Sequence, residues 1–568
     1  MPYLRGPLET VAATCILAIV CGSALAQGGP NDDDGSYARQ STQSVDDTPS
    51  DNPIGRWLTG AKGPDRKEGA EESEETAWDG LTVEDMLKKR GPIRAMLRGL
   101  DHGLVSEPSI RKKLDEIMRR IVDAAGYEDL PVKVLVLSSP QYLAGAYQDG
   151  TIYVTVGMLL DLRYEDEIAF LLAHEFAHVL KGHHRSDWFE DLQNKTFVSA
   201  GVMASWTGGF ARMTAHGGSA EARAKLFRDN SEASYEATRR ILHPAWKREQ
   251  EAEADRLGVY LAMKAKFEQQ ASLENVFIFM QKGDKQDQAD NQAVMNAVSQ
   301  VQEQKQEKSG NLFTNAFSFV GNSIGSAVKS VSGNDVSATY YPMPQRIAAV
   351  EAYRDELQEE KFTDFYDAKL LPWTRENPLP TDDARPLFDE TTDAGRLLLN
   401  YQMTAKAEQA LMENRLSDAE EQIKAATNGP TLKDAYVRYV FYSLRDMQDK
   451  QGKAAKNLAI ALEGPEVSMK IYGALIERAM AEKDYELALK NVTDAQTRIG
   501  DTPGLLPLRI GLYARMGDQQ EMEALLLACR YDHPDLVGEC EAAAKIAGAT
   551  REAGANFLED GMKRLTSD

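Results

Sequence analysis

The pentapeptide HEFAH, from His174 to His178, constrains this chain more than any other feature. The apolar run 168–173 leads into it and predicts a buried helix, in which residues four apart leave the same face. Both imidazoles can therefore bind one Zn²⁺ ion, with Zn–N bonds of about 2.0–2.1 Å. Glu175 is placed to reach a water on that ion. Two histidines do not complete a zinc site, so the chain must offer a third ligand.

Two regions are candidates for this ligand, and the first is the end of the same helix. His184 lies at the spacing of the third histidine in the metzincin motif HExxHxxGxxH. That motif needs a glycine where this chain has Lys181, and Gly182 comes one residue late. We therefore expect His183 and His184 to cap the helix C-terminus, where the helix dipole favours an imidazolium.

The second candidate region is REQEAEADRLG, residues 248–258. Glu251 and Asp255 are four apart and share one helix face, while Glu253 points elsewhere. This arrangement allows Glu251 to bind zinc while Asp255 accepts an N–H from a ligating histidine. The open alternative is an ordinary solvated acidic helix face.

HEFAH followed by ExxAD, from Glu251 to Asp255, and then a glycine resembles the gluzincins of metallopeptidase family 48. This is the group of HtpX, the CAAX prenyl protease and the BepA-like proteins, and the resemblance covers roughly residues 81–354. It implies an α+β, mostly α metallopeptidase domain with a small β-sheet. It also implies one zinc ion per chain, held by two histidines and Glu251.

Two short stretches ahead of the zinc helix fit the same resemblance. The runs 132–137 and 150–159 are rich in β-branched residues and are bounded by Ser, Pro, Asp and Gly. They resemble the hairpin-like strands that these enzymes place beside the cleft. The family often carries Asn-Ala at the start of that edge segment, and here residues 143–146 read LAGA. Substrate contacts at this edge are therefore not carried over.

A second departure lies downstream of ExxAD, in YYPMPQR, residues 340–346, where family members commonly have His-Pro followed by Arg. Tyr341 then replaces a histidine that can cover the zinc in BepA-like proteins. The resemblance gives Tyr341 the role of donating a hydrogen bond to an oxyanion or of binding zinc weakly. It gives Arg346 the role of stabilising developing negative charge. The alternative is a Tyr-Tyr-Pro turn, with Arg346 in a structural ion pair.

The first residues predict where the protein acts. Arg5, the apolar stretch 11–20 and the small residues 24–26 before Gln27 predict a cleaved signal peptide, residues 1–26. An uncleaved anchor is disfavoured because the apolar core is shorter than the ~20 residues of a membrane span. We expect a periplasmic protein if the source is bacterial.

Residues 27–79 follow, with 13 acidic and 5 basic side chains and few apolar residues. Such a segment cannot bury a core and is expected to be a disordered linker. The whole chain carries a net charge of −23. This argues against nucleic acid or anionic lipid as a partner and allows at most peripheral membrane contact.

The C-terminal part, residues 390–568, is helical by pattern, and short breaks recur about every 34 residues, the tetratricopeptide (TPR) period. We expect an all-α TPR-like repeat domain whose groove binds an extended polypeptide, and a generic α-hairpin bundle is the alternative. The breaks lie at residues 413–415, 450–452, 482–484 and 516–518.

The same C-terminal part contains Cys529 and Cys540. An oxidising compartment would allow a disulfide between them, and the alternative interpretation is that they are two small core residues.

Between the linker and the repeats, residues 80–365 are expected to form the metallopeptidase domain. Its moderately apolar segment 197–213 is interpreted as a mobile helix, a lid or a membrane-surface contact. Its polar segment 283–336 is interpreted as a flexible insertion that regulates access to the cleft.

Together these features predict a secreted or periplasmic zinc-dependent metalloendopeptidase. Zinc would lower the pKa of a water from 15.7 to roughly 7, and Glu175 would act first as base and then as acid toward the leaving amine. The resemblance to BepA-like proteins implies unfolded or mis-assembled envelope proteins as substrates and outer-membrane assembly machinery as a partner of the repeats. The alternative is a non-catalytic chaperone or assembly scaffold that binds such proteins through the repeats. Glu175 favours the enzyme, because a purely structural zinc site has no use for it.

Overall fold

The computed structural model describes most of the chain between residues 83 and 545. Three predicted segments lie outside the described residues, namely the signal peptide 1–26, the acidic linker 27–79 and the insertion 283–336. The segment 197–213 lies outside them too. Among the described residues, no helix combines the length and the apolar character that crossing a membrane requires. The described residues are 83–183 (without 106, 126, 128 and 129), single positions between 221 and 238, 248–267, 275–280, 343–360, 386–500 and 503–545 (without 539 and 542).

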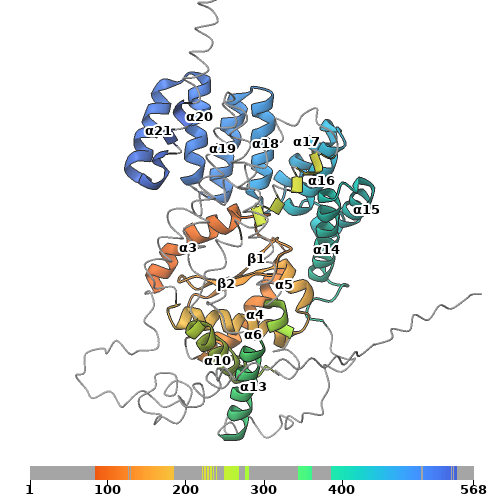
Figure 1. The fold of residues 1–568 in the computed structure, drawn as a ribbon, viewed down its shortest axis with the longest axis vertical. Coiled ribbons are helices and arrows are strands. Elements are labelled where there is room, and N and C mark those ends of the chain that lie inside the picture. The colour runs from red at the N-terminus through yellow and green to blue at the C-terminus, as the bar shows by residue number, and fades with distance from the viewer. Residues whose placement is uncertain are drawn as a thin grey trace, which may run out of the picture.

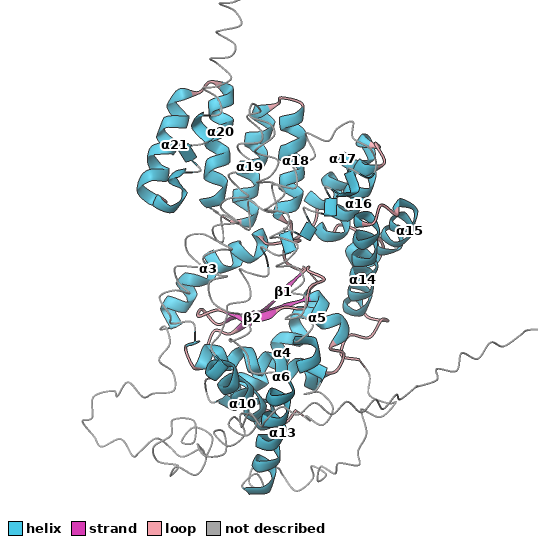
Figure 2. Cartoon of the chain, viewed as in Figure 1, coloured by secondary structure: helices cyan, strands magenta, loops and turns pink. Residues whose placement is uncertain are grey.

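A small three-stranded sheet lies in the middle of the molecule, with helices around it (Figure 2). The strands are β1 (Lys133–Leu137), β2 (Ala144–Ala146) and β3 (Thr151–Thr155), in the order β1-β3-β2. β1 and β3 are parallel, whereas β2 pairs with β3 in an antiparallel hairpin. The expectation of a hairpin between the two β-branched runs was therefore wrong in its pairing. It also placed residues 156–159 in a strand, and these belong to the short helix α5 (Val156–Asp161).

Helices pack against the sheet and build a mostly helical domain, in agreement with the expected fold class. The helix that carries HEFAH, α6 (Glu165–Leu180), is buried at every residue from 167 to 180. Glu167 closes its first turn, since its carboxylate accepts the backbone N–H of Arg163 at 2.8 Å and of Tyr164 at 3.1 Å. The other helices are α3 (Val83–Gly99), α4 (Pro108–Ala125), α10 (Arg248–Lys264) and α13 (Met343–Glu360).

Among the described residues from 393 to 532, eight α-helices form the C-terminal array as four antiparallel pairs, each packed on the next. The first pair comprises α14 (Asp393–Met412) and α15 (Leu416–Ala426), the second α16 (Ala435–Met447) and α17 (Gln451–Leu462). The third pair comprises α18 (Met469–Ala481) and α19 (Tyr485–Ile499), the fourth α20 (Leu506–Met516) and α21 (Gln519–Asp532).

The pairs turn at or next to the predicted breaks, and the break expected at 450–452 lies about two residues too late, since α17 already begins at Gln451. Each turn has the same backbone feature. The second helices of the pairs begin at residues 416, 451, 485 and 519, which are 35, 34 and 34 residues apart. Just before each of them, one residue has positive φ and reverses the chain. These residues are Asn414 (φ 59°), Asp449 (56°), Lys483 (60°) and Gly517 (79°).

The array curves over the sheet side of the N-terminal half, residues 83–360, from α14 beside α5 to α19 beside α3 (Figure 1). One continuous apolar core runs through both halves, from Ile110 in α4 to Leu512 in α20. Side chains of α14, α16 and α18 reach the N-terminal half, and α19 contacts α3. Part of the inner face of the array, where a peptide groove was expected, is therefore covered by the rest of the chain.

Buried charges join the two halves at this contact. Lys470 of α18 donates to Asp101 at 2.8 Å, and its Nζ lies 3.4 Å from His102 Nε2. The same His102 nitrogen lies 3.6 Å from the carboxylate of Glu408 in α14. We call these four residues the junction cluster, and all four are almost fully buried.

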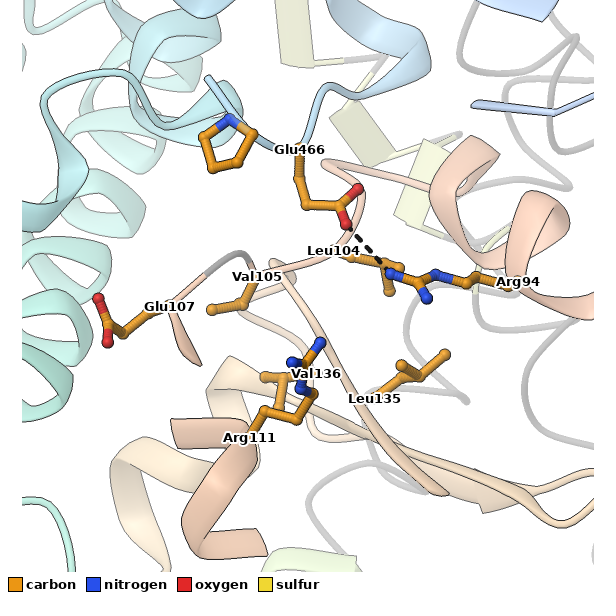
Figure 3. Close-up of a pocket in the computed structure, with 9 residues that line it drawn as sticks. Arg94, Leu104, Val105, Glu107, Arg111, Leu135, Val136 and Glu466 are labelled. Carbon is orange, nitrogen blue, oxygen red and sulfur yellow. Dashed lines mark hydrogen bonds and ion pairs between the residues drawn. The ribbon is translucent and has the colours of Figure 1, made fainter. Parts of the chain in front are cut away.

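A shallow pocket opens beside the junction cluster, between β1 and the loop that joins α17 to α18 (Figure 3). Arg94 reaches across it to Glu466 at 3.4 Å, and Arg98 binds the same carboxylate through two nitrogens at 2.8 and 3.0 Å. Glu107 and Arg111 line the opposite side. The pocket lies at the contact between the two halves, where these charged side chains meet.

Cys529 and Cys540 form a disulfide with a Cα–Cα distance of 6.7 Å. Both are fully buried and belong to a small apolar cluster that closes the end of the array. The bond ties α21 to the segment that follows it.

Candidate metal centre

Two helices bring three potential metal ligands together. His174 and His178 come from α6, and Glu251 comes from the first turn of α10, which packs along α6. The Nε2 atoms of the histidines are 3.3 Å apart. The carboxylate oxygens of Glu251 lie 3.5 Å from His178 Nε2 and 3.7 Å from His174 Nε2. All three side chains are buried.

This donor set fits zinc. Four ligands at 2.0–2.1 Å on a tetrahedron stand about 3.3 Å from one another, close to the separations found here. Two imidazoles and one carboxylate leave a fourth position, as catalytic zinc sites do. Glu175 follows His174 on the same helix and is 5% exposed. Tyr341 lies outside the described residues.

Glycine allows the two ligand helices to approach each other. A β-carbon at Gly258 of α10 would stand 2.9 Å from His174 Cα and 3.0 Å from His174 N. Any larger residue must therefore push α10 away from the helix that carries the histidines. Because Glu251 lies two turns earlier on α10, the spacing of all three ligands depends on this contact.

Asp255 and Arg346 support the ligands from behind. Asp255 Oδ1 lies 3.0 Å from His174 Nδ1, although the ring N–H is not well aligned with it. Arg346, in the first turn of α13, donates to both oxygens of Asp255 at 2.8 Å and to Glu251 at 3.0 Å. Its guanidinium is 2% exposed, so of the two roles considered for it the ion pair is the one the geometry displays.

These contacts set the charge of the site. Burial works to raise the pKa of Asp255, but Arg346 and His174 outweigh it and hold that pKa below its ordinary value. For His174, burial works to lower the pKa, and Asp255 together with Glu251 and Glu175 raises it. The site is therefore rich in negative charge and attracts a cation, which displaces the imidazole proton when it binds.

Sequence reasoning missed a third histidine beside these ligands. His183 Nδ1 lies 2.9 Å from His178 Nδ1, and His183 Nε2 lies 3.3 Å from a carboxylate oxygen of Glu253. Lys181 holds the other oxygen of Glu253 at 2.8 Å. Glu253 does point away from Glu251, as expected, but it points at His183.

The expectation that His183 caps α6 was wrong. Both ring nitrogens of His183 contact other side chains, and two of the last carbonyls of α6 accept backbone N–H groups instead: Lys181 N–H donates to Ala177 O at 3.0 Å and Gly182 N–H to Val179 O at 3.1 Å. Gly182 then takes positive φ (59°), which turns the chain back toward the helix. The only sequence signal for this chain reversal was the position of Gly182 between His178 and His183. His184 lies outside the described residues.

Comparison with known families places this site. Residues 108–353 match the family model described as Peptidase family M48. The matched segment begins with α4, contains the whole sheet and all three candidate ligands, and ends within α13 after Arg346. The helical array lies outside it. A search of curated proteins found no match.

Proposed function

We propose, from the premise that residues 108–353 form a domain of peptidase family M48, that this chain is a zinc-dependent metalloendopeptidase. The observation that carries the proposal is the buried group of His174, His178 and Glu251, with donor separations that suit a tetrahedral ion. Glu175 stands beside it on the same helix. A metal held only for structure would have four protein ligands and no need for this acid.

One zinc ion per chain would bind at these three residues. When bound, it supplies a Lewis acid that polarises the scissile carbonyl and lowers the pKa of a water to roughly 7. Glu175 takes a proton from the attacking water and later gives it to the leaving amine. Asp255 and Arg346 hold the ligands in place, since Arg346 donates hydrogen bonds to the carboxylates of both Glu251 and Asp255.

The sheet offers a way to hold the substrate. β2 pairs with β3 along one edge, and among the described strands none pairs with the other edge. β2 also contacts α6, the helix of the ligands. An extended peptide that adds to this free edge would lie beside the metal site, with main-chain hydrogen bonds fixing its register.

We further propose a periplasmic location with unfolded or mis-assembled envelope proteins as substrates. The signal-peptide pattern of residues 1–26, the acidic segment 27–79 and the disulfide between Cys529 and Cys540 support this setting. The resemblance to BepA-like proteins supports the substrate class. The array would contact substrate or outer-membrane assembly machinery through its outer helices, because its inner helices are engaged with the peptidase domain.

The rival function is a chaperone or scaffold without peptidase activity. It uses the same helical array and assigns the zinc ligands no catalytic role. The two differ over Glu175, which only the peptidase requires.

The test is metal content together with casein hydrolysis for the mature protein and for Glu175→Gln. The peptidase proposal expects one zinc per chain in both proteins and cleavage by the parent alone. Glu165→Gln is a matched control, since Glu165 lies at the half-exposed start of α6 and should leave both readouts unchanged. Zinc without cleavage in any variant would favour the scaffold, and a well-folded parent without zinc would overturn the site.

A further inference from the structure

We propose that His183 is a positioning residue for the metal site, holding the ligand His178 through a hydrogen-bonded chain that ends at Glu253. The inference rests on the proposed metallopeptidase function and adds to it residues that the HExxH and ExxAD motifs do not include. Its basis is the contact of 2.9 Å between His178 Nδ1 and His183 Nδ1.

The direction of each hydrogen bond follows from the chemistry of the metal ligand. His178 turns Nε2 toward Glu251 and His174, so that nitrogen must keep a free lone pair for the metal. The proton of the neutral ring then resides on Nδ1, which donates to His183 Nδ1. His183 in turn carries its own proton on Nε2, which donates to Glu253 at 3.3 Å. Only this pair of tautomers satisfies all three contacts with neutral rings.

Glu253 is suited to be the end of the chain. One of its carboxylate oxygens lies 3.3 Å from His183 Nε2, and a carboxylate paired with an ammonium group is a suitable acceptor for a ring N–H. Lys181 fixes this carboxylate from its other side at 2.8 Å.

The chain also connects the two helices of the site. His183 stands just past the end of α6, and Glu253 lies on α10, two residues after the ligand Glu251. The contact therefore fixes the orientation of the His178 ring and also the position of α10 beside the C-terminal end of α6. His174 has a comparable outer partner in Asp255, so each ligating imidazole is held by a side chain behind it.

The interpretation as an ordinary helix cap does not account for these contacts. Two of the last carbonyls of α6 accept backbone N–H groups, and both nitrogens of the His183 ring are directed at His178 and Glu253 instead. The side chain of His183 is 5% exposed, so its polar atoms need partners inside the protein.

The test measures zinc affinity by competition with a chelator, and the absorption spectrum of the cobalt-substituted protein, for three variants. His183→Phe keeps a ring and removes the acceptor, and it should weaken zinc binding by about 10- to 100-fold and alter the cobalt spectrum. His183→Asn retains an oxygen near the position of Nδ1 that can accept from His178, and it should restore part of the affinity. His102→Phe removes a buried histidine of the junction cluster and should leave both readouts unchanged.

The outcomes separate the inference from the function on which it rests. A parent protein that binds no zinc would overturn the metallopeptidase proposal itself. A zinc-binding parent whose affinity and cobalt spectrum match those of His183→Phe would overturn only the role of His183. If His183→Phe does not fold, Glu253→Gln keeps the size of the acceptor and removes its charge. In that variant an unchanged affinity and spectrum would count against the chain, and a several-fold loss would support it.

Discussion

Replacing Glu408 by Gln tests how firmly the helical array is joined to the peptidase domain. Glu408 is 1% exposed and accepts a hydrogen bond from Tyr436 at 2.9 Å and another from Tyr235. Burial works to raise its pKa, but His102 and Lys470 outweigh that and lower the pKa from 4.5 to about 2. The substitution preserves the shape of the side chain and removes its charge.

The size of the effect follows from this pKa. Lowering a pKa from 4.5 to about 2 corresponds to about 3 kcal/mol, at about 1.4 kcal/mol for each pKa unit. We expect Glu408→Gln to reduce the free energy of unfolding by roughly this amount, since the neutral amide cannot balance the buried Lys470. Urea denaturation measures it, and hydrogen exchange should show α14 and α16 opening first.

Glu420→Gln is the matched control for that experiment. Hydrogen bonds from Lys424 and Gln448 also lower the pKa of Glu420 to about 2, but its side chain stands near the surface of α15. Solvent screens such a pair, and we expect a loss of no more than about 1 kcal/mol. Equal losses for the two variants would refute the argument that burial makes the junction cluster strong.

Three further predictions follow from the structure. Because the folded-state pKa of Glu408 lies below 4.5, its contribution is complete above about pH 4.5 and is lost as the pH falls toward 2. The stability difference between the parent and Glu408→Gln should therefore shrink over that window, and a constant difference in urea midpoints would contradict this. Gly258→Ala should weaken zinc binding in a titration because the added methyl group pushes α10 away from α6, although alanine favours a helix by about 1 kcal/mol relative to glycine. A rise in both the free energy of unfolding and the zinc affinity would show that the two helices can accommodate the methyl group. Replacing Cys529 and Cys540 by Ala should lower the local free energy of unfolding around α21 by about 3 kcal/mol. Limited proteolysis should then cut α21 faster, while zinc binding stays unchanged.

The parts of this site that the sequence predicts are those that depend on local spacing. His174 and His178 share a helix face because they are four apart, and a helix is expected from the apolar run before them. Glu251 lies 73 residues after His178, so no local rule connects them, and its assignment needed the family resemblance. The turn positions of the array were predictable for the same local reason, because each pair repeats with a constant period.

What the sequence could not predict depends on tertiary contacts. His183 meets Glu253 only because Gly182 reverses the chain and Gly258 lets α10 lie close to α6. The pattern of β-branched residues did not indicate β2, because Ala-Gly-Ala contains none and pairs through its backbone, so only the family resemblance pointed to this edge.

The covering of the inner face of the array also escaped prediction. Lys470 and Glu408 each read as ordinary charges on a helix surface, because their partners lie more than 300 residues earlier in the chain. Only the folded chain shows that these charges are buried and neutralise each other.

The junction cluster has a consequence for how the two functions can be told apart. Truncating the chain before α14 would leave Asp101 and His102 without the array residues that neutralise them, and would cut through the shared apolar core. The freed array would in turn present Lys470, Glu408 and newly bared apolar side chains to solvent. Such a fragment would adhere to unfolded proteins whatever its natural role, and would imitate a chaperone. Single substitutions in the intact chain are therefore the sound means of dissecting this protein.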